Sequence, residues 1–218
     1  MTQLPKFEER WKYENGFYMT SPPQRIAKLL SHWELYKKAS GSPGEIVECG
    51  VFKGSSLIQL ATFREIDSIH FEKKIIGFDT FGNFPETGYE PDEENRNSFI
   101  ESAGSKSLSN KKIEKILNKK GINNNVELVK GDIEKTVPKY VEKNPHLRIS
   151  ILHVDVDIYE PSKTIMDKLF PKVVKGGVAI FDDYGDFDGE SKAIEEKIGD
   201  EYKIRSMPCG VRGAYLIK

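Results

Sequence analysis

Short apolar runs and amphipathic stretches follow one another along this chain and predict alternating strands and helices. The apolar runs predict strands at 45–49 and 74–79, and further strands that begin at Val126, Ile149 and Val178. Amphipathic stretches between them predict helices, and this alternation indicates an α/β fold with a mainly parallel sheet. Two short β segments, YKIRSMP and GAYLIK, end the chain and predict an antiparallel pair at the sheet edge.

The first 40 residues precede this alternation and form a segment of their own. Residues 1–21 are charged and aromatic, and they predict an arm that lies on a surface. Ser21 followed by two prolines marks a helix start, and the helix carries an apolar stripe that we expect in the core: Ile26, Leu29, Leu30, Trp33 and Tyr36. We expect His32, beside this stripe, to be partly exposed. The prediction is an arm and helix at 1–40 packed on a domain at 41–218.

A long polar insertion interrupts the alternation at about residues 80–125. It begins with aromatic and proline residues and continues with an acidic run, DEEN. Connections between a strand and a helix usually have about 2–6 residues, so this one is long. Its helices are expected in NSFIESA and NKKIEKILNKK. Long loops at the carboxyl ends of parallel strands commonly carry function, and we expect this insertion to act as a lid.

Four acidic residues follow two of the predicted strands. Asp155 and Asp157 come after the fourth strand, and Asp182 and Asp183 come directly after the fifth. If these strands are neighbours, up to four carboxylates converge at one edge of the sheet, where ligands of open α/β folds bind. Such carboxylates need a cation, a proton or a basic partner, and Mg²⁺ or Mn²⁺ is the simplest cation for oxygen ligands. Acidic residues also cap helices that follow strands, and this alternative stays open.

A glycine-containing loop, ECGVFKGSS, joins the first predicted strand to a helix. Such loops bring backbone N–H groups close to a ligand. The loop matches neither GxGxxG nor GxxxxGK[ST], which disfavours a nicotinamide or flavin dinucleotide and a P-loop. Asp79 ends the next strand and could accept both hydroxyls of a ribose, and Asp132 with Ile133 could lie beside an adenine ring. Helix capping is again the alternative for each acid.

At these motifs the chain resembles a known family. GFDTFGNFPE, LHVDVDIYEP and FDDYG are similar to segments of the macrocin O-methyltransferase family and of related deoxysugar O-methyltransferases of antibiotic pathways. The resemblance extends from about Ile46 to Tyr184. It implies a Rossmann-like class I methyltransferase fold, with a mainly parallel seven-stranded sheet and an antiparallel C-terminal strand pair. The chain departs from the common glycine loop at Phe52, where a middle glycine is usual.

The resemblance also implies roles for individual residues. It implies that S-adenosylmethionine is bound by nine of them: Glu48, Cys49, Gly50, Gly54, Ser55, Asp79, Gly131, Asp132 and Ile133. It implies that Mg²⁺ (or Mn²⁺) is held by three acids: Asp155, Asp182 and Asp183. Asp157 is then the base, but residues two apart in an extended chain face the same side, so Asp155 and Asp157 could exchange these roles. We expect His153, within the fourth strand, to support the site from the core.

The resemblance implies an acceptor that carries a sugar hydroxyl, in a nucleotide sugar or a glycosylated natural product. A catechol-like phenol is an alternative acceptor for the same cofactor. A metal-dependent hydrolase would use the acids but leaves the glycine loop unexplained. A nucleotide-binding scaffold without activity leaves the acids unexplained.

The composition restricts the partners and the cellular location that we expect. The 218 residues carry a net charge of -1, which gives no general attraction to nucleic acid or a membrane surface. No apolar run reaches the roughly 18 residues of a membrane span, and no apolar signal segment begins the chain. The two cysteines, Cys49 and Cys209, are expected to be reduced thiols. We expect a cytoplasmic protein with a small-molecule partner, and the sequence leaves a homo-oligomer open.

Overall fold

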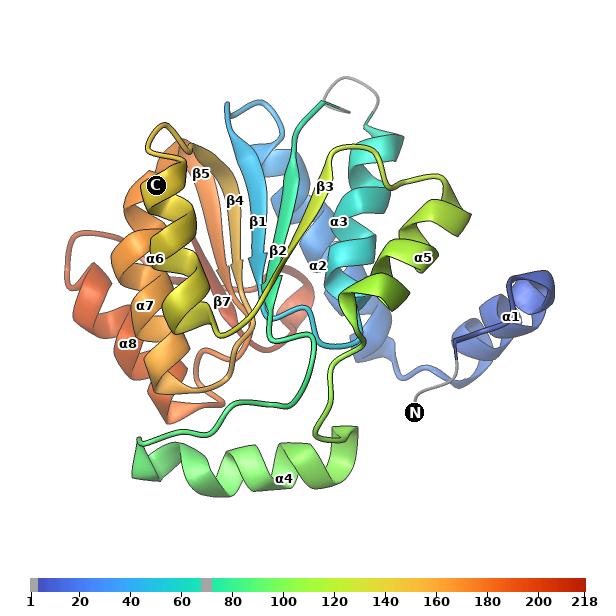
Figure 1. Cartoon of the computed structure of the whole chain (residues 1–218), viewed down its shortest axis with the longest axis horizontal. Helices are drawn as coiled ribbons and strands as arrows, with labels where there is room; N and C mark the ends of the chain where they lie inside the picture. The colour runs from blue at the N-terminus through green and yellow to red at the C-terminus, as the bar shows by residue number, and fades with distance from the viewer. Residues whose placement is uncertain (1–3, 68–71) are drawn as a thin grey trace.

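A seven-stranded sheet lies at the centre of the chain in a computed structural model that describes residues 4–67 and 72–218 (Figure 1). Its strands are β1 (Glu45–Cys49), β2 (Ile75–Asp79), β3 (Val126–Lys130), β4 (Ile149–Val154), β5 (Val173–Phe181), β6 (Arg205–Ser206) and β7 (Ala214–Ile217). The strand order is β3-β2-β1-β4-β5-β7-β6. The first three residues of the predicted N-terminal segment lie outside the described ones.

The direction of the strands agrees with the prediction from the sequence. β1 to β5 pair in parallel, whereas β7 pairs antiparallel with both β5 and β6. All residues of β2 and β4 are buried, which accounts for their continuous apolar runs. The chain order reverses where β1 lies between β2 and β4, and open α/β sheets bind ligands at such a point.

Helices cover both faces of the sheet (Figure 1). One face carries α2 (Pro23–Ala39), α3 (Ser55–Ile66) and α5 (Asn110–Lys120), and the other carries α6 (Ile133–Lys143), α7 (Tyr159–Lys168) and α8 (Asp188–Ile198). Each face buries its own apolar cluster against the sheet. Among the described residues, no helix combines the length and apolar composition that a membrane crossing needs.

The N-terminal segment differs from the expected surface arm. Leu4 and Phe7 pack against the core, but α1 (Arg10–Thr20) contains no buried residue and projects from the body (Figure 1). Trp11 and Tyr18 on this helix are 67% and 63% exposed. Trp11 and Tyr18 therefore do not lie on the surface of their own chain, because only the residues before α1, Leu4 and Phe7, reach the core.

The insertion after β2 divides into two parts with different environments. α4 (Glu93–Ala103) has no buried residue and lies across the carboxyl ends of the strands (Figure 1). α5 instead buries Ile113, Ile116 and Leu117 in the core. The predicted lid at 80–125 is therefore too long, because its second helix belongs to the helical layer on one face of the sheet.

Asp92 anchors the beginning of α4 to the body. Its carboxylate is fully buried and accepts hydrogen bonds from the backbone N–H groups of Tyr159 and Gly189, at 2.9 and 2.8 Å. These two groups lie at the N-termini of α7 and α8, where unpaired N–H groups and the helix dipoles favour an anion. A Cβ on Gly189 would lie 1.9 Å from the Asp92 Oδ2 atom, so this approach requires glycine.

Candidate active site

A cavity of about 590 Å³ opens at the carboxyl ends of β1, β2, β4 and β5. This volume lies within the range of small-molecule sites. The glycine loop, the ends of the four strands and the first turn of α6 form its walls, while Phe84, Pro85 and Phe99 from the insertion cover it. The position agrees with the ligand site that the strand order defines.

The glycine loop follows a backbone path with three left-handed residues. Gly50, Phe52 and Gly54 have φ values of 91°, 45° and 84°. Gly50 is required because a Cβ there would lie 1.6 Å from the carbonyl oxygen of Asp155. Phe52 stands where a middle glycine is usual and still adopts the left-handed conformation. This conformation is strained for a residue with a side chain. Its ring packs against Phe99 of α4, at a centroid distance of 5.3 Å, and so joins the loop to the insertion.

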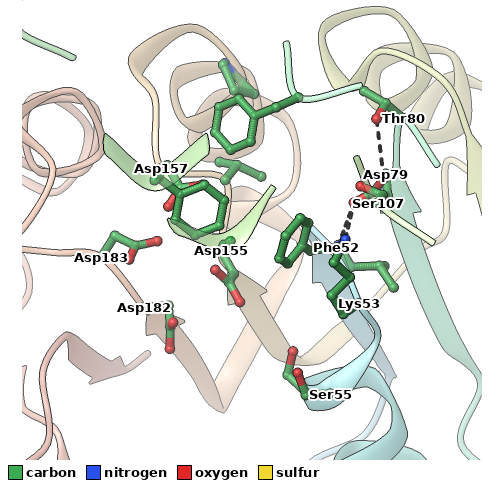
Figure 2. Close-up of a pocket in the computed structure, with 18 of the residues that line it drawn as sticks. Phe52, Lys53, Ser55, Asp79, Thr80, Ser107, Asp155, Asp157, Asp182 and Asp183 are labelled. Atoms are coloured by element: carbon green, nitrogen blue, oxygen red, sulfur yellow. Dashed lines mark hydrogen bonds between the residues drawn. The ribbon is translucent and has the colours of Figure 1, made fainter. Parts of the chain in front are cut away.

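Asp79 organises this loop through its carboxylate (Figure 2). Its Oδ2 atom accepts hydrogen bonds from the backbone N–H groups of Val51 and Phe52, at 2.9 and 2.8 Å. Its Oδ1 atom accepts a third from the N–H of Phe81. Asp79 lines the cavity. In this structure its hydrogen bonds hold the backbone between β1 and α3.

The acids of the fourth and fifth strands meet on the side of the cavity away from Asp79 (Figure 2). Backbone hydrogen bonds extend the sheet past the strand ends, from Asp155 N–H to Cys49 C=O and from Asp182 N–H to Val154 C=O. Asp155, Asp182 and Asp183 consequently place carboxylate oxygens within 4.8 Å of one another. This confirms that the two strands are adjacent and that their acids converge.

The electrostatic environment shifts the pKa values of these acids in different directions. Burial and the charges of Asp182 and Asp183 raise the pKa of Asp155 well above its usual range. Burial and the charge of Asp155 raise the pKa of Asp157 in the same way, and burial with Asp157 and Asp182 raises that of Asp183. Burial would also raise the pKa of Asp182, but contacts with His153, His32 and Lys28 hold it well below its usual range. Without a bound cation, Asp182 is thus the acid that most readily ionises.

A buried polar network lies behind Asp182. His153 and His32 place their Nε2 atoms 3.7 and 3.9 Å from the Asp182 Oδ1 atom. His153 also faces the fully buried Glu48, which accepts a hydrogen bond from the Ser56 hydroxyl. Burial lowers the pKa of His153, but the Asp182 and Glu48 carboxylates outweigh it and raise the pKa to about 10. His153 therefore supports the site from the core, as expected from the sequence.

Three cavity residues in this region were not expected to act there. Lys28 and His32 extend from α2 toward Asp182, and His32 is 2% exposed rather than partly exposed. Gln59 of α3 lies 3.0 Å from the other ring nitrogen of His32. The available signal was spacing, because Lys28 and His32 lie one helical turn apart and share a helix face.

The predicted site residues separate into those that line the cavity and those that do not. Nine line it: Gly50, Ser55, Asp79, Asp132, Ile133, Asp155, Asp157, Asp182 and Asp183. The cavity walls do not include Glu48, Cys49, Gly54 or Gly131. Glu48 and Cys49 are fully buried beneath the loop, so their predicted contact with a cofactor is corrected to a supporting position. Asp132 caps α6 by accepting a hydrogen bond from Glu134 N–H at 3.0 Å.

The sheet order, the antiparallel β7 and the cavity at the β1–β4 reversal together define the class I fold of S-adenosylmethionine-dependent methyltransferases. A solved O-methyltransferase from Bacillus cereus in complex with SAH has this fold, at 13% identity and a TM-score of 0.52, covering all of this chain and 94% of that one. Residues 15–206 match the family model of macrocin-O-methyltransferase (TylF), and the chain belongs to this family.

Known relatives are similar over part or all of the chain. The structure of a calicheamicin methyltransferase is 27% identical, with a TM-score of 0.79, and covers 99% of this chain and 86% of that one. An 8-demethyl-8-(2,3-dimethoxy-alpha-L-rhamnosyl)-tetracenomycin-C 4'-O-methyltransferase from Streptomyces olivaceus is 27% identical over 150 residues, 67% of this chain. A demethyldecarbamoylnovobiocin O-methyltransferase from Streptomyces niveus is 27% identical over 149 residues, 65% of this chain. The matches span 55% and 53% of these two relatives, about half of their length.

Proposed function

We propose that this chain transfers a methyl group from S-adenosylmethionine to a sugar hydroxyl, assisted by a divalent cation. One observation carries the proposal: the glycine loop and the acid cluster open into the same cavity from opposite sides (Figure 2). A donor bound on one side and an acceptor bound on the other would be held next to each other. Holding two reactants in this way lowers the barrier by removing translational and rotational freedom.

The residues around the loop fit the proposed cofactor. Gly50 lets the loop turn in the left-handed region and pack directly on the Asp155 backbone, and Asp79 and Asp132 offer carboxylate oxygens to hydroxyl or amino groups. Ile133 offers an apolar surface for an adenine ring beside Asp132. When bound, S-adenosylmethionine supplies an electrophilic methyl group. The chain's part is to fix the direction of that group toward the acid cluster and to exclude water beneath Phe84 and Phe99.

The acid cluster fits a divalent cation. Asp155, Asp182 and Asp183 offer only hard oxygen donors, which suit Mg²⁺ or Mn²⁺. The Oδ2 atom of Asp183 is buried without a hydrogen-bond partner, so one ligand atom is available. A cation held there would lower the pKa of an acceptor hydroxyl and orient it.

Asp157 is the base in this proposal. It lies beside Asp183, and Figure 2 places both on the acid side of the cavity. Its φ of 65° is strained for a residue with a side chain, and such strain often accompanies functional positions. A raised pKa makes the ionised carboxylate a stronger proton acceptor, which suits the removal of a proton from a sugar hydroxyl.

The relatives support a sugar as the acceptor. The name of the Streptomyces olivaceus relative specifies a substrate with a rhamnosyl group and O-methylation at a 4' position. We therefore propose a deoxysugar acceptor, as a nucleotide sugar or on a glycosylated natural product. Because S-adenosylmethionine is a metabolite of the cytoplasm, we place the reaction there.

The test is methyl transfer from S-adenosylmethionine carrying a labelled methyl group. The acceptors are TDP-rhamnose, methyl α-L-rhamnoside and a catechol, each with Mg²⁺ or with EDTA. We expect a labelled sugar ether with Mg²⁺ and a large loss of rate in EDTA. Full activity in EDTA would contradict the metal role, and labelling of the catechol alone would contradict the sugar acceptor.

Two variants and one control assign the acids. Asp182→Asn should raise the Mg²⁺ concentration needed for half-maximal rate, whereas Asp157→Asn should lower the rate and keep that concentration. Asp186→Asn is the matched control, because Asp186 lies near the cluster in sequence but pairs with Arg212 at 2.9 Å outside the cavity. An equal effect of all three substitutions would contradict the assignment.

A further inference from the structure

A lysine from α2 reaches the acid cluster. The Lys28 Nζ atom lies 2.5 Å from the Asp182 Oδ2 atom, and its side chain keeps 32% of its surface exposed. Burial would lower the pKa of Lys28, but the charges of Asp182, Asp155 and Asp183 outweigh it and raise the pKa. By geometry, the ammonium pairs with one of three carboxylates whose oxygens lie within 4.8 Å of one another.

The two oxygen atoms of Asp182 have different surroundings. The Oδ1 atom faces the buried rings of His32 and His153, at 3.9 and 3.7 Å, on the core side. The Oδ2 atom faces Lys28, whose side chain lines the cavity. A cation that enters from the cavity and binds Asp182 would meet the oxygen that Lys28 already holds. Lysine and metal would therefore compete for one ligand atom.

We propose that Lys28 is an exchangeable counter-cation of the carboxylate cluster. It pairs with Asp182 when the cluster holds no metal, and a divalent cation displaces it on binding. This inference rests on the metal site of the proposed function. Its physical basis is that three neighbouring carboxylates repel one another, and a tethered ammonium offsets part of that repulsion until a cation of higher charge arrives.

Two predictions separate displacement from a purely structural ion pair. A structural partner of Asp182 would help to hold the ligand in place, so its removal would weaken metal binding. A competitor would give the opposite sign, so removal of the ammonium should strengthen binding. Displacement also predicts that the Lys28 ammonium leaves Asp182 when metal binds. In a purely structural ion pair, Lys28 would stay paired with Asp182.

The first test measures Mn²⁺ affinity by calorimetry after EDTA treatment. Lys28→Met keeps the approximate length of the side chain without its charge, Lys28→Arg keeps a charge, and Lys163→Met is the control. Lys163 forms a surface ion pair with Glu196 at 3.2 Å and does not line the cavity. We expect Lys28→Met to bind Mn²⁺ at least about tenfold more tightly, which corresponds to about 1.4 kcal/mol. Lys28→Arg and Lys163→Met should stay near the unmodified protein.

The second test uses the unmodified protein and measures acylation of individual lysines by mass spectrometry. Acylation of Lys28 should increase several-fold when Mn²⁺ is added, while that of Lys163 should not change. Unchanged acylation of Lys28, or equal or weaker Mn²⁺ binding by Lys28→Met, would overturn the exchange. Suppose that the unmodified protein binds Mn²⁺ but Lys28 acylation does not change, or Lys28→Met binds Mn²⁺ no more tightly. The metal site then stands and only the exchange fails. If neither protein binds Mn²⁺, both the exchange and the metal part of the proposed function fail.

Discussion

Replacing Asp79 by alanine should destabilise the protein through the glycine loop. The substitution leaves three backbone N–H groups, of Val51, Phe52 and Phe81, without their acceptor. A hydrogen bond to a charged group contributes about 1.5–3 kcal/mol, so three such bonds give an upper limit near 9 kcal/mol. Water from the cavity can solvate part of the loop, and we expect a loss of about 3–5 kcal/mol in the free energy of unfolding. This is a large share of the stability of a typical domain.

The assay is urea unfolding, followed by circular dichroism, of the unmodified protein and two variants. Asp132→Ala is the matched control, because Asp132 also follows a strand and lines the cavity but accepts a single backbone N–H bond, at the start of α6, beside an exposed ion pair with Lys135. Loss of such a cap costs about 1 kcal/mol. If Asp79→Ala is too unstable to measure, Asp79→Asn keeps one acceptor oxygen and should fall between the two. A loss within about 1 kcal/mol for Asp79→Ala would refute the loop role.

Three further predictions concern the loop and the insertion. Gly50→Ala should prevent folding or cost more than about 3 kcal/mol, because a Cβ would lie 1.6 Å from the Asp155 carbonyl oxygen; native-like unfolding would contradict this close approach. Asp92→Ala should speed amide hydrogen exchange at the start of α4, since it removes the acceptor for Tyr159 and Gly189; unchanged exchange would exclude the anchor. Shortening α4 should lower acceptor turnover more than SAH affinity, and equal losses of both would indicate a purely structural role.

The sequence predicted the sheet and the convergence of acids well, for a physical reason. Buried parallel strands require continuous apolar runs, and short crossovers make successive strands neighbours. Once the two strands before Asp155 and Asp182 were recognised, their adjacency predicted that the two acids lie close together. The antiparallel β7 was predicted from the short separation of the last two β segments.

Helix faces and loop paths were predicted less well. Lys28 and His32 are polar residues on an amphipathic helix, and such residues normally face water. Their spacing placed them on one helix face, but their partner Asp182 lies 154 residues after Lys28, so the sequence around α2 did not show what that face meets. The sequence contained a pattern that marks where the insertion ends, and the prediction did not use it. Ile113, Ile116 and Leu117 follow helical spacing and mark α5 as a core helix.

We propose that one cavity holds the methyl donor on the glycine-loop side and a metal among the acids. A crystal grown with SAH and Mn²⁺ tests it most directly, because anomalous scattering locates the metal. We predict a manganese peak between Asp155, Asp182 and Asp183, with the adenine of SAH beside Ile133 and its sulfur directed toward the metal. SAH bound outside the cavity, or a cluster that remains without manganese at saturating Mn²⁺, would contradict the claim.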